Sequence, residues 1–294
     1  MRAPCAEVVR VDSHLSTRPV RWAAERLGQD VVAVEQLSGG ITSTMLALTT
    51  VDGERAVLRL MTNEPWRTHG AELTTREHQT QLLLADTPIP APRSIALDAD
   101  GAHAGEAAHL MSLVPGAVDV SRTSDADLET LARMLVDIHA LRPSVQPRTY
   151  QSWAIPAKRV VPEWAREPAA WERAFVICDE DAPAYDGTFL HRDFAPRNVL
   201  WKGPEITGVV DWVETSWGPP WLDVAHFRNN LAVTHGTDVA DRFAATYTRL
   251  TAREPQPYFD VMDIVGLLPA PGRLPFVADP AQQRRLEEHL LTVL

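Results

Sequence analysis

The feature that most limits the fold of this chain is a change of residue pattern at Pro115–Gly116. Before this dipeptide, short apolar runs alternate with Gly-containing turns, which is typical of an antiparallel meander. A Pro-free segment of good helix formers follows, and then a further apolar run that ends at the dipeptide. We expect strands over 31–37, 43–50, 55–61 and 107–114, and a helix over 69–86.

After Gly116 the pattern becomes helical. Ser124 followed by Asp127 is typical of a capped helix start, and leucines recur at helical spacing through 124–141. Further helices are expected at about 221–232, 237–253 and 280–293. The sequence therefore predicts an α+β fold in two lobes. These are an N-terminal antiparallel sheet with one helix, 1–114, and a mostly helical C-terminal part, 115–294.

Within the helical part, two apolar runs enclose an unusually polar loop, "FLHRDFAPRNVLWKG", at 189–203. Pro196 prevents a helix there, so the polar side chains stand on a loop held between two buried strands. The apolar run at Val209 and Val210 then brings Asp211 to a second strand end. Carboxylate and amide oxygens at strand ends suit a hard cation such as Mg²⁺. The polar residues of the loop are His191, Arg192, Asp193, Arg197 and Asn198.

The composition excludes several classes of protein. A formal charge of −11 argues against nonspecific binding to nucleic acid, which needs clustered Lys and Arg. Cys5 and Cys178 are too few and too far apart for a disulfide framework or a cysteine zinc site, and they suit a reducing compartment. The sequence contains neither a signal-peptide pattern nor an apolar run of about 18 residues. We therefore expect a cytoplasmic protein that acts without a membrane.

Over roughly 30 to 265, the motifs and their order resemble the aminoglycoside phosphotransferase and choline kinase-like family of small-molecule kinases. Its members have a protein-kinase-like two-lobe fold. "HRDFAPRNVLW" is similar to the family's catalytic loop and "VVDWVETSWGPPWLDVAH" to its metal-binding segment. "LSGGITS" resembles the loop that covers the nucleotide and "AVLRL" the phosphate-binding strand. "REHQTQLLLAD" resembles the helix with a partner glutamate, and "HLMSLVPG" the adenine-side hinge.

In the catalytic segments, the resemblance implies a role for each matching residue. Asp193 would be the catalytic base that orients the acceptor hydroxyl and takes its proton. Asn198 and Asp211 would hold Mg²⁺ against the phosphates of ATP. His191 would fix the loop by hydrogen bonds, and Asp223 would accept backbone N–H bonds from it. Both of these are expected to be structural supports.

In the N-terminal lobe, the resemblance implies a nucleotide site. Arg59 stands where many kinases have a lysine, and it would hold the phosphates while Glu77 pairs with it. Taken alone, Arg59 would be read as a solvent-facing strand residue. The remaining nucleotide-binding residues would be Ser38, Gly39 and Gly40 near the phosphates and Met111, Ser112 and Val114 at the adenine hinge. A hairpin turn and a buried strand end are the alternative readings of these two groups.

Two groups of acidic residues raise the question of a cationic acceptor. One group precedes the polar loop, and the other, Asp260 and Asp263, lies in the C-terminal helical part. If both border the cleft, they would form a negative pocket for a polyamine-bearing substrate. The alternative is a solvated loop and a helix that exposes its acids to water. The first group comprises Asp179, Glu180, Asp181 and Asp186.

The clustered aromatic and histidine residues are interpreted as core. Trp201, Trp212, Trp217 and Trp221 could stack on a ligand, but core packing is the more common role of such residues. His139 lies among apolar residues of an expected helix, and we read it as a core histidine with its hydrogen bonds satisfied.

The sequence thus predicts an ATP- or GTP-dependent O-phosphotransferase, with Mg²⁺, acting on a hydroxyl of a small molecule. An aminoglycoside or another antibiotic is one candidate acceptor, with antibiotic resistance as the role. The alternatives are a kinase of a choline, homoserine or sugar type of metabolite, and a nucleotide-binding pseudokinase without turnover. A protein kinase is disfavoured because the segment from Trp212 to Asp223 is too short for a peptide-docking activation segment. We expect a monomer or a homodimer.

Overall fold

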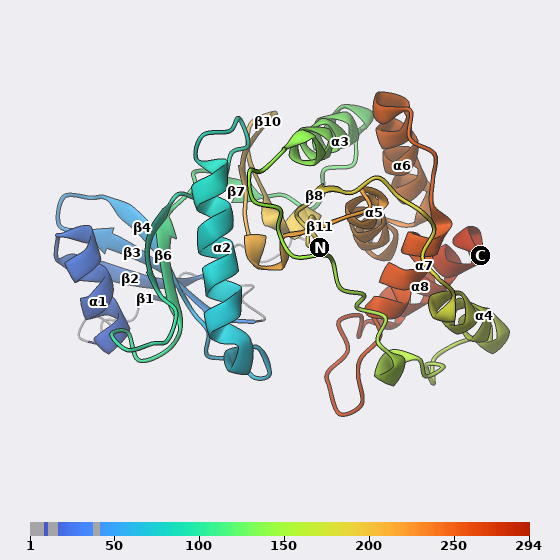
Figure 1. Cartoon of the computed structure of the whole chain (residues 1–294), viewed down its shortest axis with the longest axis horizontal. Helices are drawn as coiled ribbons and strands as arrows, with labels where there is room; N and C mark the ends of the chain where they lie inside the picture. Colours follow the sequence, from blue (N-terminus) through green and yellow to red (C-terminus); the bar gives the residue numbers. More distant parts are fainter. Residues whose placement is uncertain (1–8, 11–16, 38–41) are drawn as a thin grey trace. The chain divides into compact units, whose positions relative to one another are not determined.

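The computed structural model describes residues 9–10, 17–37 and 42–294, and Figure 1 shows the course of the chain. The chain forms two compact units. The first contains residues up to Gly116 together with Thr207–Glu214, and the second contains Ala117–Ile206 and Thr215–Leu294.

The first unit is built on a six-stranded sheet with the order β1-β2-β3-β4-β6-β5. Every pairing in it is antiparallel, and β2, β3 and β4 form the meander predicted from the sequence. The strands are β1 (Val9–Arg10), β2 (Val31–Leu37), β3 (Thr44–Thr50), β4 (Arg55–Leu60), β5 (Ser94–Asp98) and β6 (Ala108–Ser112). The helical segments are α1 (Arg18–Leu27), η2 (Trp66–His69) and α2 (Gly70–Leu84).

Helices α1 and α2 lie on opposite faces of this sheet (Figure 1). The alternation of side chains along β4 explains why. Ala56 and Leu58 belong to the apolar cluster that buries Trp22 of α1. Arg59, one residue along, points to the other face and meets Glu77 of α2. A one-residue slip of β4 would therefore exchange an apolar core for a buried cation, which fixes the register of the strand.

The second unit is mostly helical, with short strands around the polar loop. Its strands are β7 (Ala117–Val118), β8 (Thr188–Leu190), β9 (Val199–Lys202) and β11 (Ser216–Gly218). Its α-helices are α3 (Asp125–Ala140), α4 (Pro168–Asp179), α5 (Trp221–His235), α6 (Thr237–Thr251), α7 (Pro257–Gly266) and α8 (Pro280–Val293). The 3-10 turns are η3 (Pro156–Lys158) and η4 (Pro196–Asn198).

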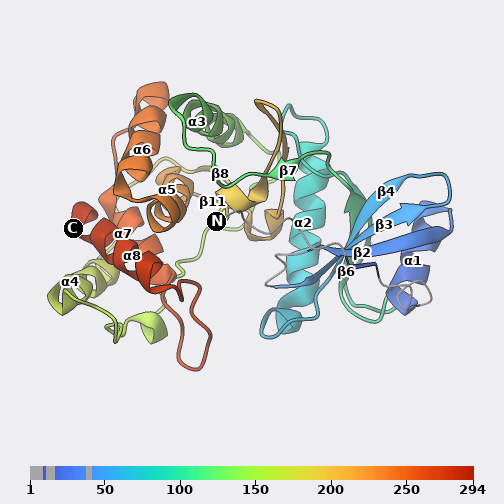
Figure 2. The same ribbon diagram turned by 180° about the vertical axis from the view of Figure 1, so that it is seen from behind.

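Helix α5 is the central helix of this unit, and it packs against α6, α7 and α8 (Figure 2). Eleven of its residues are buried, on all sides of the helix. A helix surrounded in this way can bring polar side chains into the interior only where partners wait for them. The polar residues that α5 buries are Asp223, His226 and Asn229.

Local signals explain where the best-predicted helix begins. The Ser124 hydroxyl accepts a hydrogen bond from the Asp127 backbone N–H, and the Asp127 carboxylate accepts one from the Ser124 backbone N–H, which completes a capping box at the start of α3. His139 near the end of α3 is buried and hydrogen-bonded to Tyr247, as expected for a core histidine. Helix α4 begins at Pro168, but its apolar spacing is weak and it was not predicted.

The division into units differs from the predicted lobes by two residues at the boundary, which follows Gly116, and by one returning segment. Strand β10 (Glu205–Val209) carries the chain from the second unit into the first, and the turn η5 (Trp212–Glu214) also belongs there. Hydrogen bonds explain this return, because the Val209 N–H donates to the carbonyl of Pro90 and Arg76 donates to the carbonyl of Val213. A boundary drawn at a single point, 114/115, could not include them.

Among the described residues, no helix is both long enough and apolar enough to cross a membrane.

Candidate active site

The polar loop runs from the end of β8 through η4 to β9, and α5 holds its backbone. Asp223 is fully buried, and its two carboxylate oxygens accept hydrogen bonds from the N–H groups of His191, at 2.9 Å, and Arg192, at 2.7 Å. These are the backbone bonds expected of an aspartate at this position. Within the loop, Nδ1 of the buried His191 lies 3.2 Å from the backbone N–H of Asp193. The loop therefore has little freedom to move around Asp193.

Arg192 adopts a backbone conformation that a side chain disfavours, with φ at 77°. Its guanidinium is buried over the ring of Trp153, 4.0 Å from the ring centre, and donates to the carbonyl of Gln151 at 3.3 Å. It also lies 3.6 Å from Asp263. Buried strain of this kind costs about 1–3 kcal/mol and persists only where surrounding contacts require it. The charge of the Arg192 guanidinium thus partly neutralises that of the buried Asp263 carboxylate.

Asp193 is held by side chains from two elements of the second unit, the turn η4 and helix α5. Its Oδ1 accepts from Arg197 at 2.5 Å and lies 2.9 Å from Nε2 of His226, while its Oδ2 accepts from Asn198 at 3.0 Å. Burial opposes ionisation of this carboxyl. The hydrogen bond from His226 and the charge of Arg197 outweigh burial, so the pKa of Asp193 lies well below its ordinary value. Asp193 is therefore a carboxylate at neutral pH.

Asn198 lies beside Asp193, at the end of η4. Its amide nitrogen donates both to the backbone carbonyl of Asp193, at 2.8 Å, and to the carboxylate, at 3.0 Å. With the nitrogen committed to Asp193, the amide oxygen is the atom that Asn198 can offer to a cation. Its donor chemistry fits the predicted metal role.

The structure corrects the expectation for Asp260 and Asp263. Both lie on α7 and both are buried, so they are not exposed acids on a helix surface. Asp260 accepts from the Trp221 indole at 2.6 Å and from Arg228 at 3.0 Å. Asp263 lies between His226 and Asn229. Because charged or polar groups of the chain already occupy these carboxylates, the negative pocket for a cationic acceptor predicted there is wrong.

The acids that precede β8 do follow the alternative reading. Each of them is exposed, and Asp179 forms an ion pair with Arg159. Such exposed charges contribute little to binding or stability on their own. They are Asp179, Glu180, Asp181 and Asp186.

His226 is the site residue that the sequence reading missed. It lies on α5 with 3% of its side chain exposed, and its two ring nitrogens face Asp193 and Asp263. The available signal was its spacing of three residues from Asp223, which places both side chains on one helix face. Without the position of α7, however, nothing in the local pattern places Asp263 opposite the same ring.

In the first unit, Arg59 is buried and anchored by two carboxylates. Its Nε lies 3.0 Å from Glu77 and its Nη2 lies 3.0 Å from Asp211, while Nη1 donates to Ser43 at 3.3 Å. Although burial opposes the charge of Arg59, the charges of Glu77 and then Asp211 outweigh it and raise its pKa. Arg59 is thus not the solvent-facing strand residue that it would be if read alone. The structure brings Arg59, Glu77 and Asp211 together.

Asp211 shares an unusual feature with Arg192, because its φ of 68° lies in the left-handed region. A non-glycine residue in this conformation is costly, and such residues cluster at functional sites. The segment that returns to the first unit therefore has a strained backbone at Asp211, the residue that contacts Arg59.

Glu77 is supported from behind by a buried polar relay through β6 and β5. His109 Nδ1 lies 3.0 Å from Glu77, and its Nε2 lies 2.9 Å from the hydroxyl of Ser94. That hydroxyl also lies 2.6 Å from His78. Burial alone would raise the pKa of Glu77, but the charge of Arg59 and the hydrogen bond with His109 lower it to about 2. The charge of Arg59, and after it the hydrogen bond with His109, keeps Glu77 ionised.

The predicted hinge residues lie at the end of β6. Met111 is buried, and its sulfur accepts from Gln81 of α2 at 3.3 Å. Ser112 binds Arg93 through both its backbone N–H and its hydroxyl, and Val114 follows the strand, partly exposed. The predicted phosphate-loop residues Ser38, Gly39 and Gly40 lie outside the described residues.

Three of the four tryptophans near the polar loop are core residues, as interpreted from the sequence. Trp201, Trp212 and Trp221 are buried, whereas Trp217 is partly exposed. The Arg122 guanidinium stacks on Trp201, 4.4 Å from its ring centre.

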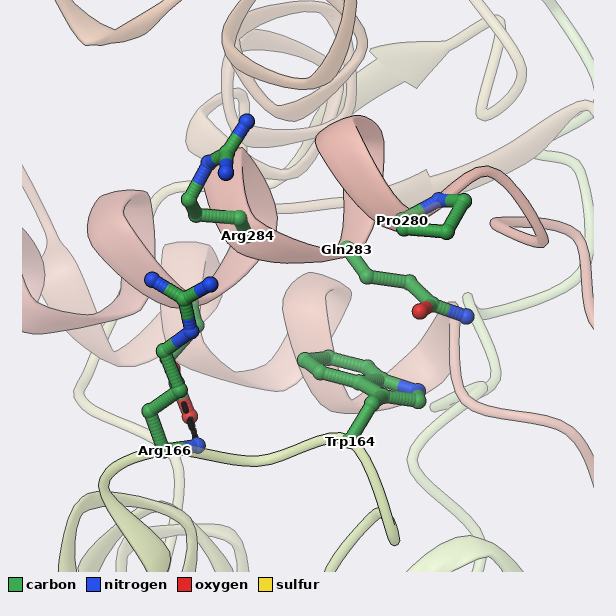
Figure 3. A pocket seen from close by; sticks show the side chains of 6 residues that line it. Trp164, Arg166, Pro280, Gln283 and Arg284 are labelled. Atoms are coloured by element: carbon green, nitrogen blue, oxygen red, sulfur yellow. Dashed lines mark hydrogen bonds between the residues drawn. The ribbon is translucent and has the colours of Figure 1, made fainter.

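A surface hollow in the second unit, between α8 and the segment before α4, is separate in its residues from this site (Figure 3). Trp164 forms one wall, and Arg166 and Arg284 line another part of it. None of the predicted site residues lines this hollow.

Among the residues that the structure describes, no group of three or more His, Cys, Asp or Glu side chains is placed to hold a metal ion.

The sequence profile of the phosphotransferase enzyme family matches residues 33–258 of the chain. No curated protein matches this chain.

Several solved structures share the fold. A thermostable variant of aminoglycoside phosphotransferase APH(4)-Ia, in ternary complex with AMP-PNP and hygromycin B, is 19% identical with a TM-score of 0.67, and the match covers 92% of this chain and 97% of that one. An aminoglycoside-3'-phosphotransferase of type VIII is 18% identical with a TM-score of 0.59, and the match covers 78% of this chain and 93% of that one. The macrolide 2'-phosphotransferase MphH from Brachybacterium faecium is 18% identical with a TM-score of 0.56, and the match covers 83% of this chain and 88% of that one. The likeness confirms the predicted protein-kinase-like α+β fold.

Proposed function

We propose, from the premise that this chain belongs to the phosphotransferase enzyme family, that it transfers the γ-phosphoryl group of ATP or GTP to a hydroxyl of a small molecule. The observation that carries the proposal is the position of the Asp193 carboxylate. This carboxylate stands on a loop whose backbone Asp223 holds, with Asn198 beside it. A fixed carboxylate next to an amide oxygen ligand is the arrangement that an alcohol acceptor and a metal-bound phosphate require.

Asp193 acts mainly by orientation in this proposal. The lowered pKa makes it a weak base, so it accepts a hydrogen bond from the acceptor hydroxyl and takes the proton only as the new O–P bond forms. Phosphoryl transfer proceeds through a loose transition state with little need for a strong base. Positioning of the hydroxyl is therefore the larger contribution.

Nucleotide binding is assigned to the first unit. Arg59, held by Glu77, would contact the phosphates, since a guanidinium binds phosphate through two parallel hydrogen bonds and stays charged. Met111, Ser112 and Val114 would receive the base, and Ser38, Gly39 and Gly40 would offer backbone amides to the phosphates. The hydrogen bond between His109 and Glu77 supports this assignment, because it adds to the charge of Arg59 in keeping Glu77 ionised.

Asn198 and Asp211 are the proposed protein ligands of Mg²⁺. Their oxygen donors fit, because Mg²⁺ binds through one or two protein oxygens, waters and substrate phosphates, with no dedicated protein cage. When bound, the ion would neutralise charge on the phosphates. The part of this chain is to present the amide oxygen of Asn198, turned by its bonds to Asp193, and the carboxylate of Asp211.

A hydroxylated antibiotic is the acceptor class that we test first. The similar solved structures include phosphotransferases of aminoglycosides and of a macrolide. A choline, homoserine or sugar type of metabolite is the second class. An antibiotic as acceptor would make resistance the biological role, with the cytoplasm, where ATP and Mg²⁺ are supplied, as its place. The protein would act as a monomer or homodimer.

The test is a nucleotide-consumption screen against hydroxylated antibiotics and metabolites. The wild-type protein should consume Mg-ATP or Mg-GTP with at least one acceptor, and Asp193→Asn should lose about 100-fold or more of that rate while keeping nucleotide affinity. Arg284→Ala in the surface hollow is the matched control and should retain the rate. Nucleotide binding without turnover on every acceptor would favour a pseudokinase. Equal rates for wild type and Asp193→Asn would reject the assignment.

A further inference from the structure

His226 connects two carboxylates inside the second unit. Its Nε2 lies 2.9 Å from Oδ1 of Asp193, and its Nδ1 lies 3.2 Å from both oxygens of Asp263. The three residues come from α5, the polar loop and α7, so the contact depends on the tertiary fold and not on a local motif.

Each nitrogen of this ring faces a carboxylate, which favours a proton on both. A neutral imidazole has one N–H and one lone pair, so one of the two carboxylates would face a lone pair at hydrogen-bond distance. The imidazolium form donates to both. Burial opposes that charge, but Asp263 and the hydrogen bond with Asp193 outweigh burial and raise the pKa of His226 to about 9.

The surroundings hold the ring in place. Trp153 packs edge-on against it, with ring centres 5.4 Å apart. Asn229 donates to Asp263 at 2.8 Å, which fixes the carboxylate behind His226. On the other side, the amide nitrogen of Asn230 donates to the backbone carbonyl of His226 at 2.8 Å, and the amide oxygen accepts from Arg197 at 2.8 Å.

The hydrogen bonds to Asp193 divide its two oxygens unequally. A carboxylate offers about two acceptor positions on each oxygen. Arg197 and His226 fill both positions on Oδ1. Asn198 fills one position on Oδ2. One acceptor position, on Oδ2, therefore remains for a further donor.

We propose that His226 is a positioning residue for Asp193, acting as an imidazolium that saturates Oδ1 so that Oδ2 alone receives the acceptor hydroxyl. This inference rests on the proposed function. In the transfer step the acceptor O–H bond breaks, the new O–P bond forms, and the γ-phosphorus separates from the β-phosphate oxygen. The hydroxyl proton goes to Oδ2, while His226 keeps both of its protons.

In this role, the protonation state of His226 makes the rate of phosphoryl transfer depend on pH. Because the pKa of His226 is raised, the cation is complete at neutral pH and is lost as pH rises through about 9. The rate should fall over the same range. The charged groups around the ring are Asp193, Arg197, Arg192 and Asp263, with Lys158 facing Asp263.

Two variants separate positioning from simple packing. His226→Gln keeps an amide donor for Asp193 but no charge, and His226→Phe keeps only the ring volume. With the best acceptor from the screen, we expect kcat to fall roughly 10- to 100-fold for Gln and further for Phe, with the KM for ATP changed less than about 2-fold. The alkaline loss of rate near pH 9 should disappear in both. His289→Gln, another buried histidine of the same unit, is the control.

A second measurement does not depend on turnover. Nitrogen NMR of the wild-type protein labelled at histidine should show one imidazolium at pH 7.5 that titrates near pH 9 and is absent in His226→Gln. A neutral His226 at pH 7.5, or a Gln variant with wild-type kcat and an unchanged alkaline limb, overturns the inference. If no acceptor is phosphorylated, the proposed function fails, while the NMR result still decides whether the cationic clamp exists.

Discussion

Arg59 illustrates how a single buried charge can connect structure with ligand binding. It touches Glu77, Asp211 and Ser43, so it is already oriented before any phosphate arrives. A long side chain that is already ordered loses less conformational entropy when the ligand binds. In the proposed site, Asp211 would also serve the metal, and Glu77 would then remain as the anchor of Arg59.

Removing the guanidinium should affect phosphate binding selectively. We expect Arg59→Ala to weaken ATP roughly 10- to 100-fold in calorimetry and adenosine less than about 3-fold, because only ATP carries phosphates to hold. Arg59→Lys, which keeps a charge but lacks the fork of donors, should fall between the two. Arg55→Ala changes an exposed arginine of the same strand and serves as control. Equal losses for ATP and adenosine would show that Arg59 is only structural.

A layer of polar side chains joins strands β4, β5 and β6 to helix α2. Arg59, Ser94 and His109 point from the sheet toward the helix, and Glu77 meets Arg59 and His109 from the helix. Buried polar groups stabilise a fold only when every partner is in place. The layer thus fixes which face of the sheet α2 covers, and in what register.

Removing one hydroxyl from this layer should cost stability in the first unit. Ser94→Ala removes the hydroxyl that lies 2.9 Å from Nε2 of the buried His109, which should lower the free energy of unfolding by about 1–3 kcal/mol. Chemical denaturation measures this change. Ser121→Ala, which removes an exposed hydroxyl, is the control and should change it by less than about 0.5 kcal/mol. A stability equal to the wild type would mean that water replaces the hydroxyl.

The elements that the sequence predicted well are those with a local signal. The meander alternates visibly, and the start of α3 has its capping box. The loop around Asp193 was found because motif spacing is also local. What could not be predicted depends on distant neighbours. The acids of α7 look like surface residues until α5 brings His226 and Arg228 against them. His226 itself became visible only with them.

At the scale of the whole molecule, stability should have limits on both sides of neutral pH. The pKa of Glu77 is lowered to about 2, so the stability it contributes is present above about pH 4.5 and is lost as pH falls toward 2. The pKa of His226 is raised to about 9, so its contribution is complete below about pH 6.5 and is lost as pH rises through 9.

In thermal unfolding followed across pH, the contributions of Glu77 and His226 should therefore both be complete between about pH 4.5 and 6.5. Glu77→Gln should make the acid limb shallower and leave the alkaline limb in place, and His226→Gln should remove the alkaline limb. Glu72→Gln alters an exposed glutamate of the same helix as Glu77 and should leave both limbs in place. Variants that lower the midpoint equally at every pH would show that charge is not the cause.

A single genetic crossover near Pro115–Gly116 would separate residues that the fold keeps together. Such an exchange inherits Arg59 from one parent and Asp211 from the other, because residues 207–214 are encoded far downstream yet belong to the first unit. Shuffled genes of this kind would succeed only where both parents agree on the pair, or where a second crossover carries the short returning segment along. The first unit is therefore discontinuous as a unit of inheritance.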